Sequence, residues 1–362
     1  MRTVLVLGST GSVGTQTLEL LEANPDKFKL VGISGYSNRE LLESQRRKFS
    51  LSPDQVALGP EAAAELVTSL SADIVVNGIT GSAGLMATLA ALKCGSQLAL
   101  ANKESLIVGG ELVTSLAKRD QILPVDSEHS AIAQCLLAGK ANEVAKLVLT
   151  ASGGPFRGMS LKQLETVTPV QALQHPTWSM GKVITTNSAT MVNKGLEVIE
   201  AHMLFGVGFQ DIAVTVHPQS IVHSMVEFFD GSVIAQASPP DMKLAIGFAL
   251  GYPNRLEAAT KPIDWSQSHS WQFEPLDEEV FRAVKLARQV GIAGKTFPAV
   301  YNAANEEAVE AFHDGKVSFL GITNLIDQVL QDHNPDELSL AGVLAAESWA
   351  RMAANSLIAK SQ

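Results

Sequence analysis

The sequence predicts an α/β protein with an N-terminal doubly wound parallel sheet, a central α+β region and a C-terminal helical bundle. Three observations support this prediction. Short apolar runs alternate with helical patterns over the first 125 residues, which is the rhythm of βαβ units. A glycine-rich turn, GSTGSVG at 8–14, separates the first apolar run from the first helical pattern. Beyond residue 278 the patterns are helical, which is typical of a small bundle.

The boundaries of the expected elements follow from hydrophobic periodicity and from Gly, Pro and Asn at their ends. In the first region we expect strands over residues 3–7, 29–33, 55–58, 74–77, 97–101 and 122–125, and helices over 13–24, 39–48, 61–70 and 85–93. In the central region we expect strands over 146–150, 212–216, 221–228 and 232–237. At the C-terminal end we expect helices over 278–290, 298–313 and 318–330, and a last one within 338–358.

Composition and charge exclude several classes of protein. With 46% hydrophobic and 18% charged residues, the 362-residue chain is expected to be soluble and globular. A net charge of −10 argues against nucleic-acid partners. The chain has neither an apolar run of about 20 residues nor a signal-peptide pattern, so we expect no membrane partner. The two cysteines, Cys94 and Cys135, lie in apolar helical patterns and are interpreted as packing residues of a cytoplasmic protein.

The glycine turn predicts a nucleotide site. Its G-x-x-G-x-x-G spacing, between a strand and a helix, allows a pyrophosphate to approach the backbone at the start of the helix. The other interpretation is a plain structural turn. We expect the contacts to come from the following residues: Gly8, Thr10, Gly11, Ser12 and Val13.

The segment after the second expected strand indicates which nucleotide is bound. An NAD enzyme usually has Asp or Glu here, whereas this chain has Gly35 followed by Ser37, Asn38 and Arg39. These polar and basic residues suit a 2′-phosphate, so we expect NADPH as the cofactor. The alternative is that Arg39 merely begins a solvated helix.

Polar residues at two further strand ends are candidate site residues. Asn102, Lys103 and Glu104 follow the strand at 97–101, and ligands of such sheets bind at the carboxyl ends of the strands. Asp126 and Glu128 follow the strand at 122–125, and residues i and i+2 of an extended segment point to one side.

Two convergent carboxylates need a proton or a cation between them, and Mg²⁺ or Mn²⁺ prefers oxygen ligands. We therefore expect Asp126 and Glu128 to bind a divalent metal. The alternative is that they are helix N-terminal acids stabilised by the helix dipole. His129 is a second possible ligand, although a lone histidine at a helix start is more often a local hydrogen-bonding group.

Two loops of the central region carry chemically distinctive residues. Ser152 lies in a tight glycine turn, which offers a hydroxyl and exposed N–H groups. The segment HPTWSMG at 175–181 is bracketed by Pro176 and Gly181 and is not expected to be helical. Its Trp178 and Met180 indicate either a flap over a ligand or a loop fixed to the core. His217 and His223 lie in the expected sheet, where either can be structural.

The segment TTNSATMVNKGLEVIE at 185–200 predicts an anion site at a helix N-terminus. Asn187 or Ser188 is expected to cap a helix that ends at Gly206. Ser188, Asn193 and Lys194 would then lie near the free N–H groups of the first turn, as phosphate requires. Glu197 follows Asn193 at i,i+4 and shares its face. An ordinary capped amphipathic helix is the alternative.

Together these residues resemble one family, the 1-deoxy-D-xylulose 5-phosphate reductoisomerases. The matching motifs run in order through nearly the whole chain: GSTGSVG at 8–14, ANKES at 101–105, PVDSEH at 124–129, SGGPF at 152–156, HPTWSMG at 175–181, NSATMVNKGLE at 187–197, HPQSIVHSMVEF at 217–228 and FPAVYNAANEEAV at 297–309. The resemblance implies NADPH- and divalent-metal-dependent isomerisation and reduction of 1-deoxy-D-xylulose 5-phosphate to 2-C-methyl-D-erythritol 4-phosphate, in the non-mevalonate isoprenoid pathway. Mg²⁺ or Mn²⁺, with Co²⁺ as a further option, would be the metal.

The resemblance also assigns roles to residues. It implies Asp126, Glu128 and Glu197 as metal ligands, and it alone favours Glu197 over Glu200. The catalytic set is these three residues with Lys103, which also belongs to the cofactor-binding set together with Asn102 and Glu104. The substrate-binding set comprises Ser127, Ser152, His175, Trp178, Met180, Ser188, Asn193, Lys194 and His223. Among these, Ser152, Ser188, Asn193 and Lys194 would hold the phosphate, with His175 beside them.

On this interpretation the chain divides into an NADPH-binding domain at 1–125, a catalytic and connective domain at 126–250, a linker at 251–277 and a helical domain at 278–362. The family also implies a homodimer. Two other functions remain open: a semialdehyde-type NADP-dependent dehydrogenase, which needs a nucleophilic cysteine near the nicotinamide, and a non-catalytic NADP(H)-sensing protein.

Overall fold

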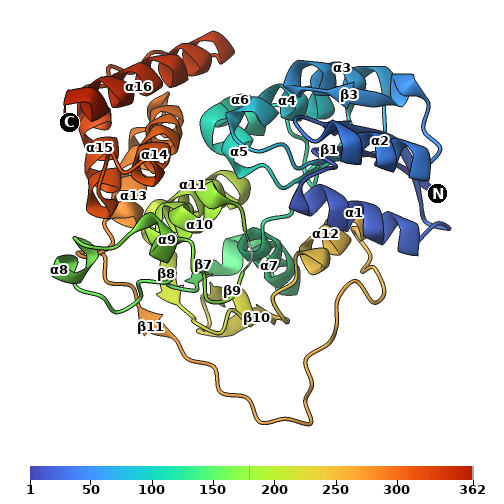
Figure 1. Ribbon diagram of the computed structural model, residues 1–362. Coiled ribbons are helices and arrows are strands. Elements are labelled where there is room, and N and C mark those ends of the chain that lie inside the picture. The colour runs from blue at the N-terminus through green and yellow to red at the C-terminus, as the bar shows by residue number, and fades with distance from the viewer. Residues whose placement is uncertain (179, 361–362) are drawn as a thin grey trace. The chain divides into compact units, whose positions relative to one another are not determined.

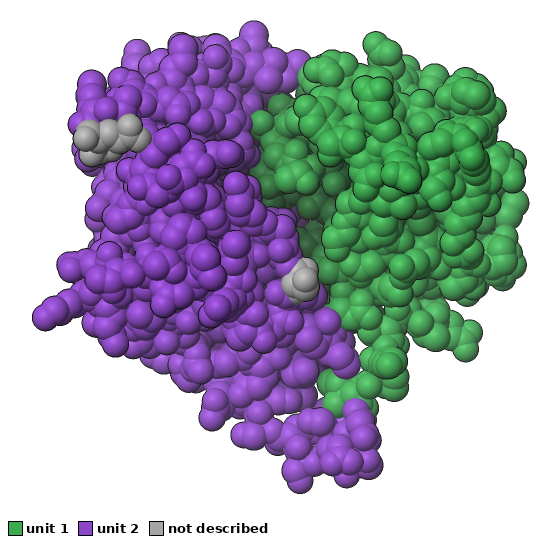
Figure 2. All heavy atoms as spheres, in the orientation of Figure 1, with its two compact units in different colours: residues 1–106, 113–137, 241–263 green, residues 107–112, 138–240, 264–362 purple. Residues whose placement is uncertain are grey.

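The computed structural model describes residues 1–178 and 180–360, which form two compact units (Figures 1 and 2). Unit 1 comprises residues 1–106, 113–137 and 241–263. Unit 2 comprises residues 107–112, 138–240 and 264–362. Among the described residues, no helix is both long enough and apolar enough to cross a membrane.

Unit 1 is built on a six-stranded parallel sheet with the order β3-β2-β1-β4-β5-β6. Its strands are β1 (Arg2–Leu7), β2 (Phe28–Gly35), β3 (Val56–Leu58), β4 (Ile74–Asn77), β5 (Gln97–Leu100) and β6 (Ile122–Pro124). The central strands β1 and β4 are almost wholly apolar and buried, as expected of a sheet covered on both faces. This confirms the predicted doubly wound parallel sheet.

Helices alternate with these strands in the expected order. They are α1 (Ser12–Ala23), α2 (Arg39–Lys48), α3 (Pro60–Leu70), α4 (Leu85–Cys94), α5 (Lys103–Gly109), α6 (Glu111–Thr114) and α7 (Ser127–Cys135). Three short 3-10 turns also occur at Pro53–Gln55, Ser82–Gly84 and Leu136–Ala138. A further helix, α12 (Met242–Gly251), packs against α1 and contributes Ile246 and Leu250 to the same core. Cys135 is buried as expected, but Cys94 is exposed, so its interpretation as a packing residue was wrong.

Unit 2 contains a mixed five-stranded sheet with the order β10-β9-β7-β8-β11. Its strands are β7 (Val144–Ala151), β8 (Ile212–Val216), β9 (Val222–Phe228), β10 (Val233–Ala237) and β11 (Glu274–Pro275). β7 and β8 are parallel, and the other pairings are antiparallel. The 3-10 turns Ala141–Glu143 and Phe209–Asp211 precede β7 and β8.

The predicted capped helix of unit 2 is in fact two helices. α10 (Lys182–Ala189) ends before α11 (Val192–Phe205), and Met191 between them has the left-handed φ of 63°. Asn187 and Ser188 therefore lie in the last turn of α10, and the prediction that one of them caps the following helix was wrong. The sequence showed no glycine or proline at this break. The predicted end at Gly206 is confirmed, with φ 67°.

The remaining elements of unit 2 are helical, as Figure 1 shows in orange and red. α14 packs against α13, α15 and α16. The bounds are α13 (Ala283–Ala293), α14 (Phe297–His313), α15 (Phe319–Gln331) and α16 (Leu340–Lys360), with the short α8 (Leu161–Leu164) and α9 (Pro169–Ala172) earlier in the chain. α13 begins five residues later than predicted, because Asp277 caps a turn through the N–H groups of Glu279 and Val280. The domain boundaries drawn from the sequence remain predictions; the observed units differ from them in placing 126–137 and 241–250 with the N-terminal sheet.

Candidate functional site

The glycine turn of unit 1 is packed so closely that side chains would not fit. A Cβ on Gly8 would lie 2.6 Å from the carbonyl oxygen of Gly78, and one on Gly14 would lie 2.3 Å from that of Gly8. α1 begins after Gly11, and no side chain caps it. The first N–H groups of a twelve-residue helix therefore face outward from a turn whose Gly11 and Ser12 are exposed, which suits a pyrophosphate.

The segment after β2 is exposed and shaped by one capping contact. The Asn38 side chain accepts a hydrogen bond from the N–H of Leu41 at 3.1 Å and so caps α2. Arg39 is the first residue of α2, and within residues 1–178 and 180–360 its guanidinium makes no hydrogen bond or ion pair. Gly35 ends β2, where a Cβ would lie 3.4 Å from the Thr10 methyl group. This brings the strand end against the glycine turn.

Asn102 serves the structure of this sheet edge. Its side-chain amide donates to the carbonyl oxygens of Ile79 and Gly81 at 2.6 and 2.7 Å and to Glu104 at 3.1 Å, and its oxygen accepts from the N–H of Ser105 at 2.9 Å. The loop after β4 is thereby fixed to the end of β5. Asn102 and Glu104 are hydrogen-bonded to each other, whereas Lys103 contacts Asp126.

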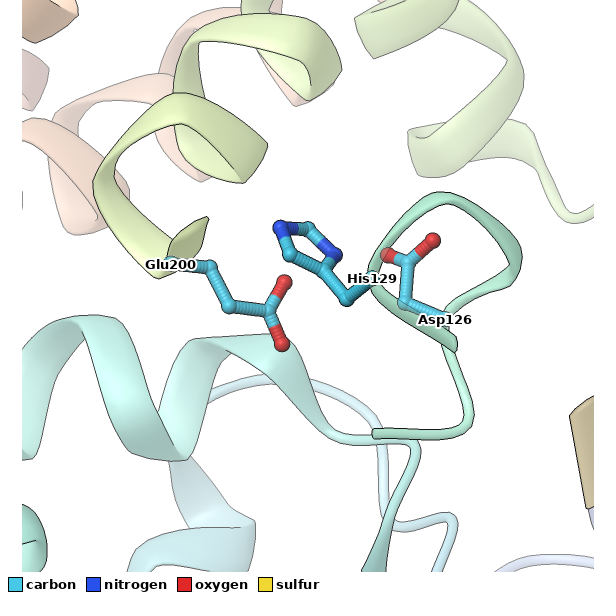
Figure 3. Close-up of side chains that lie close together, drawn as sticks. All are labelled: Asp126, His129 and Glu200. Carbon is cyan, nitrogen blue, oxygen red and sulfur yellow. The ribbon is translucent and has the colours of Figure 1, made fainter. Parts of the chain in front are cut away.

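Lys103 forms an ion pair with Asp126, the residue that precedes α7 (Figure 3 shows Asp126 with His129). The side chains of Lys103 and Asp126 are 14% and 10% exposed. Burial is the largest influence on the pKa of Asp126 and raises it, but the charge and hydrogen bond of Lys103, together with His129 and a hydrogen bond from Glu128, outweigh burial and hold this pKa well below its usual range. Asp126 is therefore ionised at neutral pH although it is largely buried.

Glu128 lies beside Asp126, as the i,i+2 spacing predicts. An oxygen of Glu128 lies within 4.8 Å of an oxygen of Asp126, and a ring nitrogen of His129 also lies within 4.8 Å of an Asp126 oxygen. The Ser127 hydroxyl donates to Glu128. Two carboxylates at this separation form an oxygen-rich donor set that suits a hard divalent cation.

In unit 2, Ser152 and His175 form a network of defined polarity. The Nδ1 atom of His175 accepts from the N–H groups of Thr177 and Trp178 at 3.1 and 2.9 Å, so this nitrogen carries no proton. The proton of the neutral ring is then on Nε2, which donates to the Ser152 hydroxyl at 3.0 Å. Burial lowers the pKa of His175, which favours this neutral form. Because Ser152 also accepts from the N–H of Gly154 at 3.2 Å, its own hydrogen is available to donate to a ligand.

Gly154 brings Ser152 and Ser188 together, although their positions in the sequence are far apart. Its φ is 65°, and a Cβ at this position would lie 2.9 Å from the Ser188 carbonyl oxygen. Only glycine allows the turn after β7 to touch the last turn of α10 in this way. Sequence reasoning missed this role, although the two consecutive glycines of SGGPF were a signal for it.

The first turn of α11 holds a second buried ion pair. Lys194 pairs with Glu197, and the two side chains are 4% and 1% exposed. The Asn193 amide donates to the same carboxylate, as its i,i+4 spacing predicts. Asn193 and Lys194 therefore contact Glu197 directly, whereas the sequence placed them on a phosphate. Glu200 lies one turn further along α11 and is buried (Figure 3).

The described residues of the expected flap, 175–178 and 180–181, lie in no helix or strand. Its Trp178 ring lies 6.3 Å from the ring of His223, which is on β9 and hydrogen-bonds Ser238 at 3.1 Å. Met180 is half-buried and its carbonyl oxygen accepts from Thr185 at 3.3 Å. Ser179, which completes the HPTWSMG motif, lies outside the described residues. A cavity of about 460 Å³ adjoins Ser152, between Phe156, Met159, Gln174 and Pro176.

Comparison with known proteins gives the family. Models of the 1-deoxy-D-xylulose 5-phosphate reductoisomerase match residues 4–57 and 51–110, and models of its C-terminal domains match 122–205 and 237–353. A reductoisomerase of Leifsonia xyli subsp. xyli is 58% identical over 361 residues, which cover 99% of each chain. One of Mycobacterium marinum is 56% identical over 376 residues, with 99% and 93% covered. The chain belongs to the 1-deoxy-D-xylulose 5-phosphate reductoisomerase family.

Solved structures of reductoisomerases agree over the whole chain. The Zymomonas mobilis reductoisomerase, solved in complex with NADPH, superposes with a TM-score of 0.91 at 40% identity, and 99% of each chain is covered. A second reductoisomerase, solved with NADPH, fosmidomycin and magnesium, gives a TM-score of 0.90 at 36% identity, with 99% and 98% covered. The expectation of a reductoisomerase fold is confirmed.

Proposed function

We propose that this chain converts 1-deoxy-D-xylulose 5-phosphate to 2-C-methyl-D-erythritol 4-phosphate, with NADPH and Mg²⁺, in the non-mevalonate isoprenoid pathway. The observation that carries the proposal is 58% identity to a reductoisomerase over 99% of both chains. Reductoisomerase structures solved with NADPH and with magnesium give the cofactors. This conclusion displaces the semialdehyde-type dehydrogenase and the NADP(H)-sensing protein. Mn²⁺ and Co²⁺ remain proposals as substitutes for Mg²⁺.

For the cofactor, we infer that the glycine turn receives the pyrophosphate and that the segment after β2 receives the 2′-phosphate. The fit rests on the close packing at Gly8 and Gly14, which leaves no room for side chains, and on the uncapped start of α1. Arg39 is exposed and lies at the first turn of α2, where its charge can meet a phosphate. When bound, NADPH supplies the hydride that reduces the aldehyde.

For the metal, we infer that Asp126, Glu128 and Glu197 are the ligands. The donor chemistry fits, because carboxylate oxygens are the ligands that Mg²⁺ prefers. Each of two of these residues is paired with a lysine, Asp126 with Lys103 and Glu197 with Lys194. The bound ion would supply a Lewis acid that polarises the ketone of the substrate.

For the substrate, we infer that unit 2 holds the phosphate group. Ser152 is a directed hydroxyl donor because His175 and Gly154 both donate to it. Ser188 lies against the same turn, and Asn193 and Lys194 begin α11. Binding this distant group fixes the orientation of the reacting carbons without taking part in the chemistry. Ser127 and Lys103 would contact the substrate's oxygens, and Trp178, Met180 and His223 would exclude water.

We also propose a cytoplasmic homodimer. Neither Cys94 nor Cys135, both among the described residues, forms a disulfide, as is usual in a reducing compartment. β10 is an edge strand of the unit 2 sheet, and apolar side chains are exposed on it and beside it: Phe229 at 72%, Val233 at 49% and Ile234 at 38%. An exposed apolar edge of this kind favours pairing with a second copy. Ile234→Lys should shift the mass measured by light scattering toward that of the monomer. An unchanged dimer mass would show that the β10 edge is not the dimer interface.

The activity is tested by following NADPH absorbance. We expect it to fall only when NADPH, 1-deoxy-D-xylulose 5-phosphate and Mg²⁺ are all present, and to stop on addition of a chelator. NMR of the product should show the methyl-branched carbon skeleton of 2-C-methyl-D-erythritol 4-phosphate. Absence of NADPH oxidation with all three components present would contradict the proposed function.

A further inference from the structure

The side chain of Gln45 on α2 is buried and joins that helix to the glycine turn. It is 7% exposed, and both ends of its amide contact Ser9. Its Nε2 donates to the Ser9 carbonyl oxygen at 2.9 Å, and its Oε1 accepts from the Ser9 hydroxyl at 2.7 Å. The two contacts fix the orientation of the amide, because the carbonyl oxygen of Ser9 requires a donor.

Ser9 is the second residue of the turn at 8–14 and is fully buried. The turn is also attached to the end of β2, because the N–H of Ser9 donates to the Ser34 carbonyl oxygen at 2.8 Å and the N–H of Gly8 donates to the Ser34 hydroxyl at 3.2 Å. The turn would therefore keep its shape without Gln45. Leu42 packs α2 into the core, and Gln45 supplies its hydrogen bonds to the turn.

α2 begins at the exposed segment that we propose to bind the 2′-phosphate. Asn38 caps it and Arg39 is its first residue, six residues before Gln45. At a rise of 1.5 Å per residue, Arg39 lies roughly 9 Å along the helix from Gln45. The exposed ion pairs of α2 do not reach the turn: Glu43 pairs with Arg46 and Arg47 within the helix, and Lys48 at its far end pairs with Glu22 of α1. The polar contact from α2 to the turn is the one made by Gln45.

We propose that Gln45 is a positioning residue for cofactor specificity. By joining α2 to Ser9, it sets the distance between the turn that receives the pyrophosphate and the residues Ser37, Asn38 and Arg39 that receive the 2′-phosphate. The inference rests on the proposed NADPH site. NADH lacks the 2′-phosphate, so its affinity depends on the turn and not on where α2 begins.

The test is a fluorescence titration of the full-length protein with NADPH and with NADH, in the absence of metal and substrate. Gln45→Met keeps the side-chain volume and removes both hydrogen bonds. We expect it to lower the NADPH-to-NADH affinity ratio by on the order of tenfold, chiefly by weakening NADPH. Ser9→Ala removes the 2.7 Å contact with Gln45 and the 3.1 Å contact of the same hydroxyl with the Ser34 carbonyl oxygen, but keeps the bond from Gln45 Nε2 to the Ser9 carbonyl oxygen. It should lower the ratio less than Gln45→Met, in the same direction.

Gln121→Met is the matched control. Gln121 is also 7% exposed and lies in unit 1, and its amide donates to the carbonyl oxygens of Leu92 and Ser96, far along the chain from the turn. It should lose thermal stability much as Gln45→Met does and keep the affinity ratio. If Gln45→Met and Ser9→Ala weaken both nucleotides equally, the inference is overturned.

Arg39→Ala separates this inference from the site on which it rests. A lower NADPH-to-NADH ratio in Arg39→Ala upholds the 2′-phosphate site, and the Gln45 and Ser9 variants then decide the role of Gln45 alone. An unchanged ratio in Arg39→Ala would overturn the 2′-phosphate assignment and the positioning role with it.

Discussion

Asp126 in unit 1 and Glu197 in unit 2 are both largely buried carboxylates paired with a lysine, but the two pairs are built differently. The partner of Asp126 comes from another strand end, 23 residues earlier, and the pair is 14% and 10% exposed. The partner of Glu197 lies three residues earlier on the same helix, and this pair is 4% and 1% exposed. The first pair depends on the order of strands in a sheet, and the second on the period of a helix.

The difference shows how one charge arrangement can be reached by two routes. β5 and β6 are neighbours in the sheet, so the residues that follow them meet at one edge. The helix needs no neighbour, because i,i+3 residues share a face. Both arrangements place a lysine ammonium beside a largely buried carboxylate.

The largest expected effect tests whether both carboxylates serve one reaction. Glu197→Gln and Asp126→Asn should each lower kcat/KM by roughly 10³-fold, because each removes a charge that we propose to hold the Lewis acid. NADPH affinity, measured by fluorescence, should stay unchanged. Glu200→Gln is the control on the same helix and should lose far less activity; a greater loss in Glu200→Gln would transfer the ligand role to Glu200.

The next effect compares the two lysines. Lys194→Met removes the ammonium beside Glu197, a carboxylate that is 1% exposed, which should lower the free energy of unfolding by about 3–5 kcal/mol. Lys103→Met should cost less, because water reaches the Asp126 pair more easily. Urea denaturation measures both. Equal losses would show that burial does not distinguish the pairs.

Much of this arrangement was predictable from the sequence, and the exceptions have physical reasons. The strand–turn–helix rhythm and the strand-end position of Asp126 follow from local pattern, and the Asn193–Glu197 contact follows from i,i+4 spacing. The break between α10 and α11 at Met191 could not be predicted from local pattern, because the left-handed conformation is rare for a non-glycine residue and depends on tertiary packing. The contact of Gln45 with Ser9 joins residues 36 positions apart and leaves no trace in periodicity.

A smaller effect tests the phosphate region of unit 2. Gly154→Ala would place a Cβ 2.9 Å from the Ser188 carbonyl oxygen, so the two serines should separate and KM for the substrate should rise roughly tenfold. Gly158→Ala is the matched control, because Gly158 also has a positive φ, 78°, but a Cβ there meets nothing within 4 Å. It should cost about 1 kcal/mol of stability and leave KM unchanged. Equal KM values for both variants would show that the contact with Ser188 does not matter.

The smallest effect concerns pH. Burial lowers the pKa of His175 below the ordinary 6.5, so the folded protein favours the neutral ring. The resulting stabilisation is complete above pH 6.5 and declines as the pH falls through 6.5 toward the lowered pKa. His175→Gln should flatten this part of the stability profile, measured by urea denaturation between pH 5 and 7. In the wild type, ¹⁵N NMR should show Nδ1 without a proton at pH 7; a protonated Nδ1 would contradict the network with Thr177 and Trp178.

The central proposal is that Asp126 and Glu197 bind the same metal ion. Mn²⁺ binding followed by electron paramagnetic resonance tests it most directly, with Asp126→Asn, Glu197→Gln and the double variant. One shared ion predicts that each single variant loses most of the affinity of a single site, and that the double variant loses less than the two single losses added together. Strictly additive losses, or one variant that keeps full affinity, would contradict the account.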